Sequence, residues 1–98
     1  MTRNAAIQKL ADRADAIRTR GATALYLFGS TQRDEARDTS DLDLFVDIDP
    51  KVKFSLIDLA GIKLYLEREL DILVDVTTRD SLHPLIRADI KREALRVF

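Results

Sequence analysis

The stretch that decides the fold runs from Leu25 to Val46 and reads LYLFGSTQRDEARDTSDLDLFV. An apolar run ends at Gly29 and Ser30, ten residues follow, and Asp41 and Asp43 then open a second apolar run. Side chains alternate along an extended strand, so the two aspartates are expected to share one face. The opposite face can be buried, because the alternate residues are all apolar: Leu42, Leu44, Val46 and Ile48.

Both ends of the ten-residue segment carry groups that can bind a charged ligand. Gly29 ends its strand without a Cβ, so the backbone can turn sharply and a ligand can approach its amide. Ser30 offers a hydroxyl and an N–H where a short helix would begin, and a helix N-terminus favours anions such as phosphate. Repulsion between Asp41 and Asp43 is relieved by protonation or by a hard cation with oxygen ligands. The stretch therefore suggests a site that binds a polyphosphate together with a metal ion.

Each part of this pattern has a simpler reading on its own. An isolated Gly-Ser is usually a plain turn, and an isolated Asp-x-Asp is usually a solvated strand start or a helix cap. An EF-hand is excluded because Phe45, Val46 and Ile48 replace residues that such a loop needs. A serine-hydrolase nucleophile is excluded because the segment 28–32 lacks the second glycine of the nucleophile elbow. The combination is more specific than its parts.

The combined pattern resembles the signature of a known enzyme superfamily. Gly29 and Ser30, ten residues, then Asp41 and Asp43, with Arg33 between them and a serine just before the first aspartate, resemble the nucleotidyltransferases related to DNA polymerase beta. The short chain is similar to the minimal nucleotidyltransferases, the MNT antitoxins encoded beside HEPN-domain toxins. The resemblance covers nearly the whole chain.

A third carboxylate, Asp75, interrupts the apolar run Leu73–Val76. The resemblance implies that this residue is the family's third acid on the following strand. An aspartate that simply faces water at a strand end is the alternative. Asp71 competes for the role, but it follows a predicted helix at a place where Gly would be commoner, so we interpret it as a turn residue.

The resemblance also implies a mechanism. Asp41 and Asp43 would hold two Mg²⁺ ions, and Asp75 would help to hold the ion that activates the incoming hydroxyl. Asp75 could also accept the proton of that hydroxyl. Gly29 and Ser30 would grip the β and γ phosphates of a nucleoside triphosphate. Attack on the α phosphate would transfer NMP and release pyrophosphate.

Arg33 is a further candidate for the nucleotide site. It lies one helical turn after Ser30 and could neutralise phosphate charge. The alternative is a surface arginine paired with Asp34 or Asp41. Family members usually have a small residue before this arginine and a glycine after it, whereas Gln32 and Asp34 stand there in this chain.

Length and composition restrict the class of protein. The 98 residues predict one domain, 1–98, and 46% hydrophobic with 34% charged residues is typical of a soluble globular protein. The net charge of −1 supplies no basic field, which disfavours direct nucleic-acid binding. Absence of cysteine excludes a disulfide framework and a thiolate zinc site and fits a cytoplasmic location. No apolar run is long enough for a signal peptide or a membrane span.

Hydrophobic periodicity predicts alternating helices and strands. Helices are expected over 1–20, 31–36, 54–70 and 81–95, and strands over 23–28, 41–48 and 72–77, with a polar loop over 38–40. Gly21 is placed to stop the first helix, Pro84 is tolerated in the first turn of the last, and His83 before it is interpreted as a cap or loop residue. The predicted fold class is α/β (α+β), a small mixed sheet of about three to four strands flanked by helices.

The resemblance implies a protein partner. The acceptor would be a hydroxyl, typically of a tyrosine, on a cognate HEPN ribonuclease toxin, which AMP transfer from ATP would silence within a hetero-oligomer. Two alternatives stay open: an antitoxin that blocks its toxin by stoichiometric binding, and NMP transfer to a small molecule. The segment 54–70 is apolar on more than one face, so it is either buried within its own domain or part of an interface.

Overall fold

The computed structural model describes residues 1–33, 35 and 41–98. In chain order its elements are α1 (Arg3–Ala11), α2 (Ala14–Thr19), β1 (Ala22–Phe28), α3 (Gly29–Gln32), β2 (Leu42–Ile48), α4 (Leu56–Leu70), β3 (Val74–Thr78), the 3₁₀ turn η1 (Arg79–Ser81), α5 (Pro84–Glu93) and β4 (Leu95–Arg96). The predicted loop 38–40 and the predicted helix end at Ala36 lie outside the described residues. No described helix has both the length and the apolar character needed to cross a membrane.

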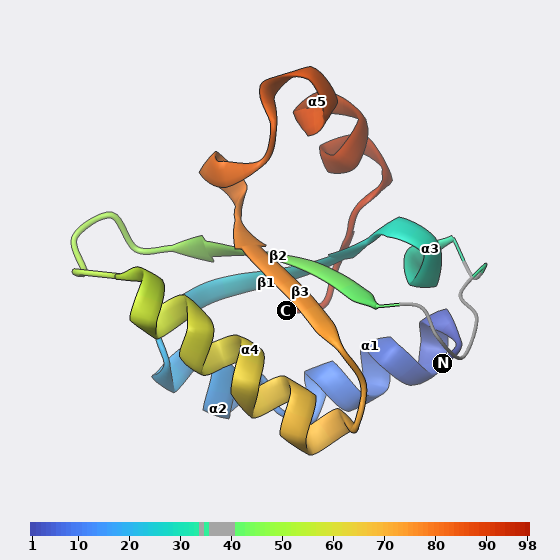
Figure 1. Cartoon of the computed structure of the whole chain (residues 1–98), viewed down its shortest axis with the longest axis horizontal. Coiled ribbons are helices and arrows are strands. Elements are labelled where there is room, and N and C mark those ends of the chain that lie inside the picture. Colours follow the sequence, from blue (N-terminus) through green and yellow to red (C-terminus); the bar gives the residue numbers. More distant parts are fainter. Residues whose placement is uncertain (34, 36–40) are drawn as a thin grey trace.

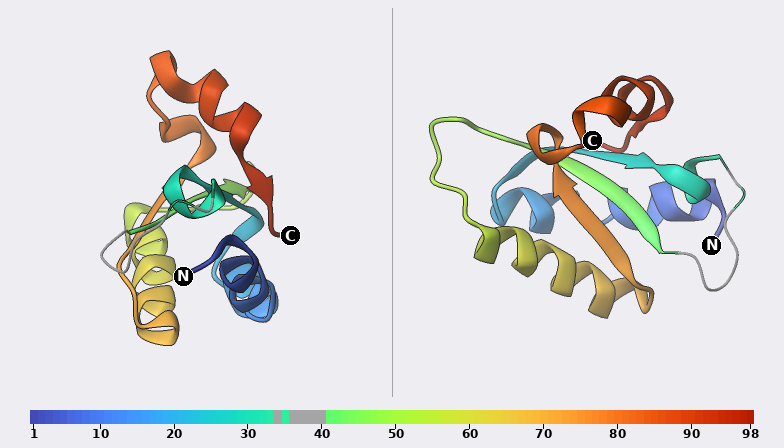
Figure 2. Two further views of the ribbon diagram at one scale, coloured as in Figure 1. Left: turned by 90° about the vertical axis from the view of Figure 1, so that its right-hand side faces the viewer. Right: turned by 45° about the horizontal axis from the view of Figure 1, so that its top comes forward.

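The described strands form one four-stranded sheet in the order β3-β2-β1-β4. β1 runs antiparallel to β2 and to β4, whereas β2 and β3 are parallel. Helices α1, α2 and α4 lie against one face of the sheet, and α5 stands on the other side (Figures 1 and 2). The mixed sheet flanked by helices confirms the predicted fold class.

The core lies between the sheet and the helices on its covered face. The predicted alternation in β2 is confirmed, because Leu42, Leu44 and Val46 belong to this core, whereas the buried Phe45 stacks on Tyr26 outside it. Ile48, at the end of the strand, is only partly buried. The helices contribute Ala6 and Leu10, Ile17, and Ile62, Leu66 and Leu70, all buried in the same cluster. Full burial of each large aliphatic side chain contributes about 1.5–3 kcal/mol. Because this core fixes β2 in place, it also fixes the positions of Asp41 and Asp43 at the start of that strand.

The predicted helix over 1–20 was wrong, because the structure has two short helices there. Arg13, between α1 and α2, has φ −109° and ψ 13°, which is not helical. Its own Nη1 donates to the carbonyl oxygen of Lys9 at 2.8 Å, so its side chain supplies a donor to the last turn of α1. As predicted, Gly21 follows α2; its φ is +114°.

The predicted helix over 81–95 was wrong at both ends. A proline disfavours helical backbone in the residue before it, so α5 begins at Pro84 and not at Ser81. His83 is the N-cap, accepting a hydrogen bond at Nδ1 from the Leu85 N–H at 3.1 Å, which confirms its predicted cap role. After α5, Leu95 and Arg96 pair with β1 as a fourth strand that periodicity did not reveal.

Helix α4 is apolar on more than one face, and only one of these faces is buried. Ile62 and Leu66 are 0% exposed on the face toward the sheet, whereas Leu56 and Ile57 are each 83% exposed. The helix is therefore partly a core element and partly an apolar surface.

Asp71 is the turn residue that the sequence predicted, and it gives a stability test. It ends α4 in the left-handed region, with φ 53° and ψ 45°. Asp71→Gly should raise the free energy of unfolding in urea by about 0.5–1 kcal/mol, because relief of left-handed strain exceeds the extra entropy of glycine in the unfolded chain. Asp71→Ala, which keeps a Cβ and loses the polar group, should lower it. A glycine variant less stable than the wild type would contradict this interpretation.

Candidate active site

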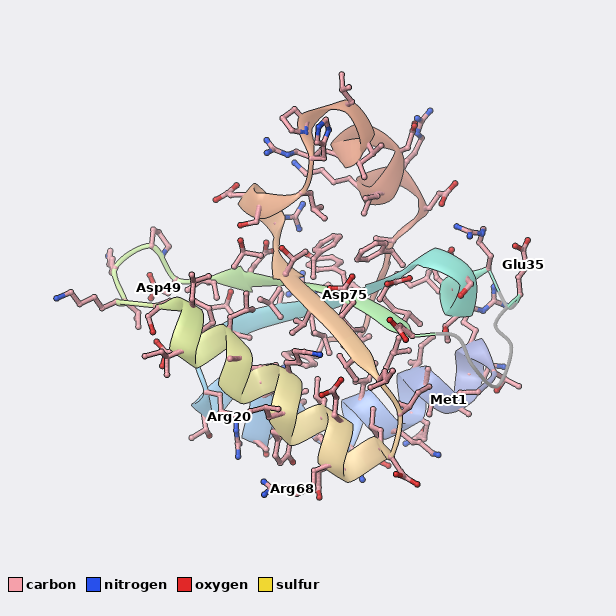
Figure 3. The ribbon with its side chains drawn as sticks, in the orientation of Figure 1. Met1, Arg20, Glu35, Asp49, Arg68 and Asp75 are labelled. Carbon is pink, nitrogen blue, oxygen red and sulfur yellow. The ribbon has the colours of Figure 1, made fainter. Side chains whose placement is uncertain are left out.

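The site begins with a row of three side chains across neighbouring strands. Phe28 at the end of β1 is the partner of Asp43 in β2, and Asp43 is the partner of Asp75 in β3. Partners in adjacent strands project on the same side of a sheet. Asp43 is half-buried and, by the alternation of side chains, lies on the face of the sheet opposite Leu42 and Leu44. Asp75, its partner in β3, is exposed (Figure 3). The structure therefore brings together two of the predicted acids.

Asp41 lies immediately before β2 and is exposed. Its negative charge raises the pKa of Asp43, which places it within electrostatic reach of that carboxyl group. The three predicted acids thus come from two adjacent strand ends. Within residues 1–33, 35 and 41–98, no three acidic or imidazole side chains are gathered tightly enough to form a ready-made metal site.

The carboxyl group of Asp43 has a raised pKa. Burial raises the pKa of its carboxyl group, the charges of Asp75 and then Asp41 raise it further, and Arg33 lowers it. The half-buried carboxylate therefore carries an electrostatic cost that a cation would remove. Carboxylate oxygens are the ligands that Mg²⁺ prefers, so the donor set fits that ion in its chemistry.

The structure shows why position 29 needs a glycine, for a reason that was not visible in the sequence. Its φ is +77°, and a Cβ built on it would lie 2.3 Å from Oδ2 of Asp43. A glycine was expected here so that a ligand could approach the backbone. In the structure, the group that needs the space is the Asp43 carboxylate itself.

Helix α3 holds the predicted phosphate-binding residues beside the acids. Ser30 is half-buried, and its carbonyl oxygen accepts a hydrogen bond from the Glu35 N–H at 2.8 Å. Thr31, which the sequence analysis did not single out, is 1% exposed and anchors the helix in the protein. Arg3 Nη1 donates to the carbonyl oxygen of Gln32 at 3.4 Å, so α1 also supports α3.

Arg33 is held by carboxylates other than those considered from the sequence. Its Nε lies 3.3 Å from Glu35 Oε2, and its Nη1 lies 3.5 Å from Glu93 Oε2 at the end of α5. The Arg33 side chain is 44% exposed, and ion pairs of this kind are weak enough for phosphate to compete with them. Asp34 lies outside the described residues.

A second cluster of interacting side chains was not predicted from the sequence. It lies on the face of the sheet opposite α1, α2 and α4. Arg79 in η1 donates from Nε and Nη2 to the carboxylate of Asp47 at 2.6 and 2.9 Å. This hydrogen bond is the main reason that the pKa of Asp47 is lowered. The guanidinium also lies 4.9 Å from the ring centroid of Tyr26 and 5.2 Å from that of Phe45, which are stacked on each other. The pair ties the segment that leads to α5 onto the sheet; only the alternating polar position of Asp47 hinted at it.

Comparison with known proteins gives consistent matches over most of the chain. The family described as the nucleotidyltransferase domain matches residues 7–97. The chain is 40% identical over 78 residues to a protein of Methanocaldococcus jannaschii provisionally named a protein adenylyltransferase, covering 80% of this chain and 82% of that protein. A solved structure provisionally named a minimal nucleotidyltransferase has a TM-score of 0.74 at 35% identity, covering 97% of this chain and 95% of that one.

Two solved toxin–antitoxin complexes share the fold at lower identity. One, determined with AMP-PNP, gives a TM-score of 0.74 at 19% identity, covering 90% of this chain and 72% of that one. The other holds a tri-AMPylated Shewanella oneidensis HEPN toxin with its MNT antitoxin, and gives a TM-score of 0.67 at 18% identity, covering 94% and 71%. At this identity the likeness shows the fold alone.

The space at Gly29 can be tested with a matched pair of substitutions. Gly29→Ala should lower nucleotidyl transfer about 100-fold, because the added Cβ displaces the Asp43 carboxylate, strains the backbone at φ +77°, and misplacement by about 1 Å has an effect of that size. Gly61→Ala is the control, since a Cβ at Gly61 on α4 meets nothing within 4 Å. The control should keep full activity and gain about 1 kcal/mol of stability. Equal activity of the two variants would show that the space at Gly29 is not needed.

The perturbed pKa of Asp43 predicts how stability depends on pH. Below the ordinary value of 3.8 the carboxyl group is protonated in both states, so it contributes no difference. As pH rises, the unfolded chain ionises first, and the folded state loses stability until pH passes the raised folded pKa. Asp43→Asn cannot ionise, so in EDTA its free energy of unfolding should rise relative to the wild type as pH increases from below 3.8 until the raised folded pKa has been passed. A relative fall, measured by urea denaturation, would contradict this.

Proposed function

This chain belongs to the nucleotidyltransferase family, and we propose that it transfers AMP from ATP to a hydroxyl group of a partner protein. The pairing of Asp43 with Asp75 in parallel strands, beside Asp41, is the observation that carries the proposal. The relative from M. jannaschii supports a protein acceptor by its name, and the complex with AMP-PNP supports ATP as the nucleotide.

The residues of the chain have distinct roles in this proposal. Asp41 and Asp43 would hold two Mg²⁺ ions, and Asp75 would be a further ligand of one of them. When bound, Mg²⁺ neutralises triphosphate charge and favours ionisation of the attacking hydroxyl. Gly29 and Ser30 bind the β and γ phosphates at the start of α3.

The transfer itself is a displacement at the α phosphorus. The acceptor oxygen forms a bond to the α phosphorus as the bond to the bridging oxygen breaks, and pyrophosphate leaves with the electron pair. Asp75, exposed at the site, accepts the hydroxyl proton. Arg33 exchanges Glu35 and Glu93 for phosphate oxygens, which offsets the charge of the nucleotide.

The proposed acceptor is a tyrosine hydroxyl of a HEPN ribonuclease toxin. Support comes from the shared fold with an MNT antitoxin found in complex with a tri-AMPylated HEPN toxin. AMP on the toxin adds a negative charge and bulk, which hinder the approach of RNA to its cleavage site. The chain would thereby act as an antitoxin.

The experiment is a label-transfer assay with the product of the neighbouring gene, Mg²⁺ and ATP labelled at either the α or the γ phosphate. Label from the α position alone should be retained on the partner, and mass spectrometry should assign it to tyrosine. Asp43→Asn should lower transfer at least about 1,000-fold, as loss of an essential electrostatic group does. Asp80→Asn, an exposed aspartate on η1, is the control and should retain activity.

A second measurement separates catalysis from simple occlusion. Cells that express the toxin should be protected by the wild type and by Asp80→Asn, but not by Asp41→Asn combined with Asp43→Asn. Full protection by that double variant, with binding to the toxin intact, would favour an antitoxin that acts by stoichiometric binding.

A further inference from the structure

β3 is an edge strand of the described sheet, so one row of its backbone groups faces away from β2. The Leu42 N–H donates to the carbonyl oxygen of Leu73 at 2.9 Å, so the Leu73 carbonyl faces β2. Backbone groups of successive strand residues point in opposite directions, and those of Val74 therefore face the free edge. Val74 directly precedes Asp75. An unpaired edge at this place would leave the N–H and carbonyl groups of Val74, next to Asp75, without partners.

Two side chains of α4 satisfy both backbone groups of Val74. The Val74 N–H donates to Glu67 Oε2 at 2.9 Å, and Lys63 Nζ donates to the carbonyl oxygen of Val74 at 2.8 Å. Lys63 Nζ also lies 2.9 Å from Glu67 Oε2, which closes the arrangement. The Glu67 side chain is only 20% exposed, and Val74 is 2% exposed. Lys63 and Glu67 thus replace a missing neighbouring strand.

The helix that carries these side chains is itself firmly placed. Ser55 and Asp58 form a capping box at the start of α4, and Asp71 ends it with a single left-handed residue. Ile62 and Leu66, on the adjoining turns, are fully buried. Side chains on such a helix can fix a strand in one position.

An ordinary surface ion pair does not account for this arrangement. A Lys–Glu pair four residues apart on an exposed helix contributes only a few tenths of a kilocalorie per mole and needs no further partner. Here each member also bonds to the same residue of β3. The Val74 amide and the Lys63 ammonium lower the pKa of Glu67, so its carboxylate is charged at neutral pH.

We propose that Lys63 and Glu67 are positioning residues, which hold the Val74 backbone so that Asp75 stays beside Asp43. The inference rests on the proposed function for the catalytic meaning of Asp75. It adds two residues to the site that are not among the aspartates at positions 41, 43 and 75. The peptide bond between Val74 and Asp75 transmits the effect, because its carbonyl oxygen is the atom that Lys63 binds.

The test compares Glu67→Ala and Lys63→Met with matched controls on the same helix. Glu69→Ala removes a glutamate that pairs with Arg13 at 3.7 Å, and Arg68→Met removes a cation that points away from the sheet into solvent (Figure 3). Glu67→Gln keeps an oxygen that can accept from the Val74 N–H, and serves as the conservative rescue. All measurements are made at a temperature where urea titration shows every protein to be folded.

Three readouts should change together. In NMR spectra without metal, the contact between side-chain protons of Asp43 and Asp75 should be lost in Glu67→Ala and Lys63→Met, and the Val74 amide should exchange at least about 10-fold faster. In the label-transfer assay, kcat should fall about 10- to 100-fold, the range typical of groups that orient a ligand, with KM for ATP changed less than about 2-fold. Glu67→Gln should recover most of the loss, and both controls should match the wild type.

The outcomes separate this inference from the proposed function. Survival of the contact between Asp43 and Asp75 in Glu67→Ala and Lys63→Met would overturn the positioning role, whatever the enzyme activity. Equal kcat in Glu67→Ala and Glu69→Ala would overturn it as well. Loss of the contact in a protein whose wild type transfers no label would support the positioning role and count against the proposed function.

Discussion

The parallel pairing of β2 with β3, in the register that makes Asp43 the partner of Asp75, is the constraint on which the site depends. A shift by one residue would bring Asp43 beside an apolar neighbour and turn the acid of β3 to the buried face. Two separate features hold the register. Leu42, Leu44 and Val46 fix the face of β2 by burial, and the side chains of Lys63 and Glu67 hold the free edge of β3.

The register brings carboxyl groups of like charge together, and the folded state contains the resulting electrostatic repulsion. Asp43 is the residue that shows it, since burial and the charges of Asp75 and Asp41 all raise the pKa of its carboxyl group. Gly29 shapes the packing beside this group, because the absence of a Cβ lets α3 begin directly against the Asp43 carboxylate. A bound divalent cation would offset these negative charges, and we propose that Mg²⁺ has this role in nucleotidyl transfer.

The sequence predicted the parts of this site that depend on local patterns. The alternation of apolar residues predicted β2 and its buried face. The positions of Gly29 and the aspartates, which resemble those of a known family, predicted the three acids of the site. Features that arise from local backbone geometry or from contacts distant in sequence were missed. The break at Arg13, the start of α5 at Pro84 and the pairing of Leu95 with β1 each reflect backbone geometry or tertiary pairing that periodicity does not encode. The spacing of Lys63 and Glu67 was visible, but their common partner, Val74, was not.

The most direct measurement is a crystal structure of the protein with Mn²⁺ and a non-hydrolysable ATP analogue, in which anomalous scattering locates the metal. We expect Mn²⁺ to be bound by the carboxylates of Asp41, Asp43 and Asp75, with the β and γ phosphates at Gly29 and Ser30. Manganese bound elsewhere, or a nucleotide held without contact to Asp43 and Asp75, would contradict it.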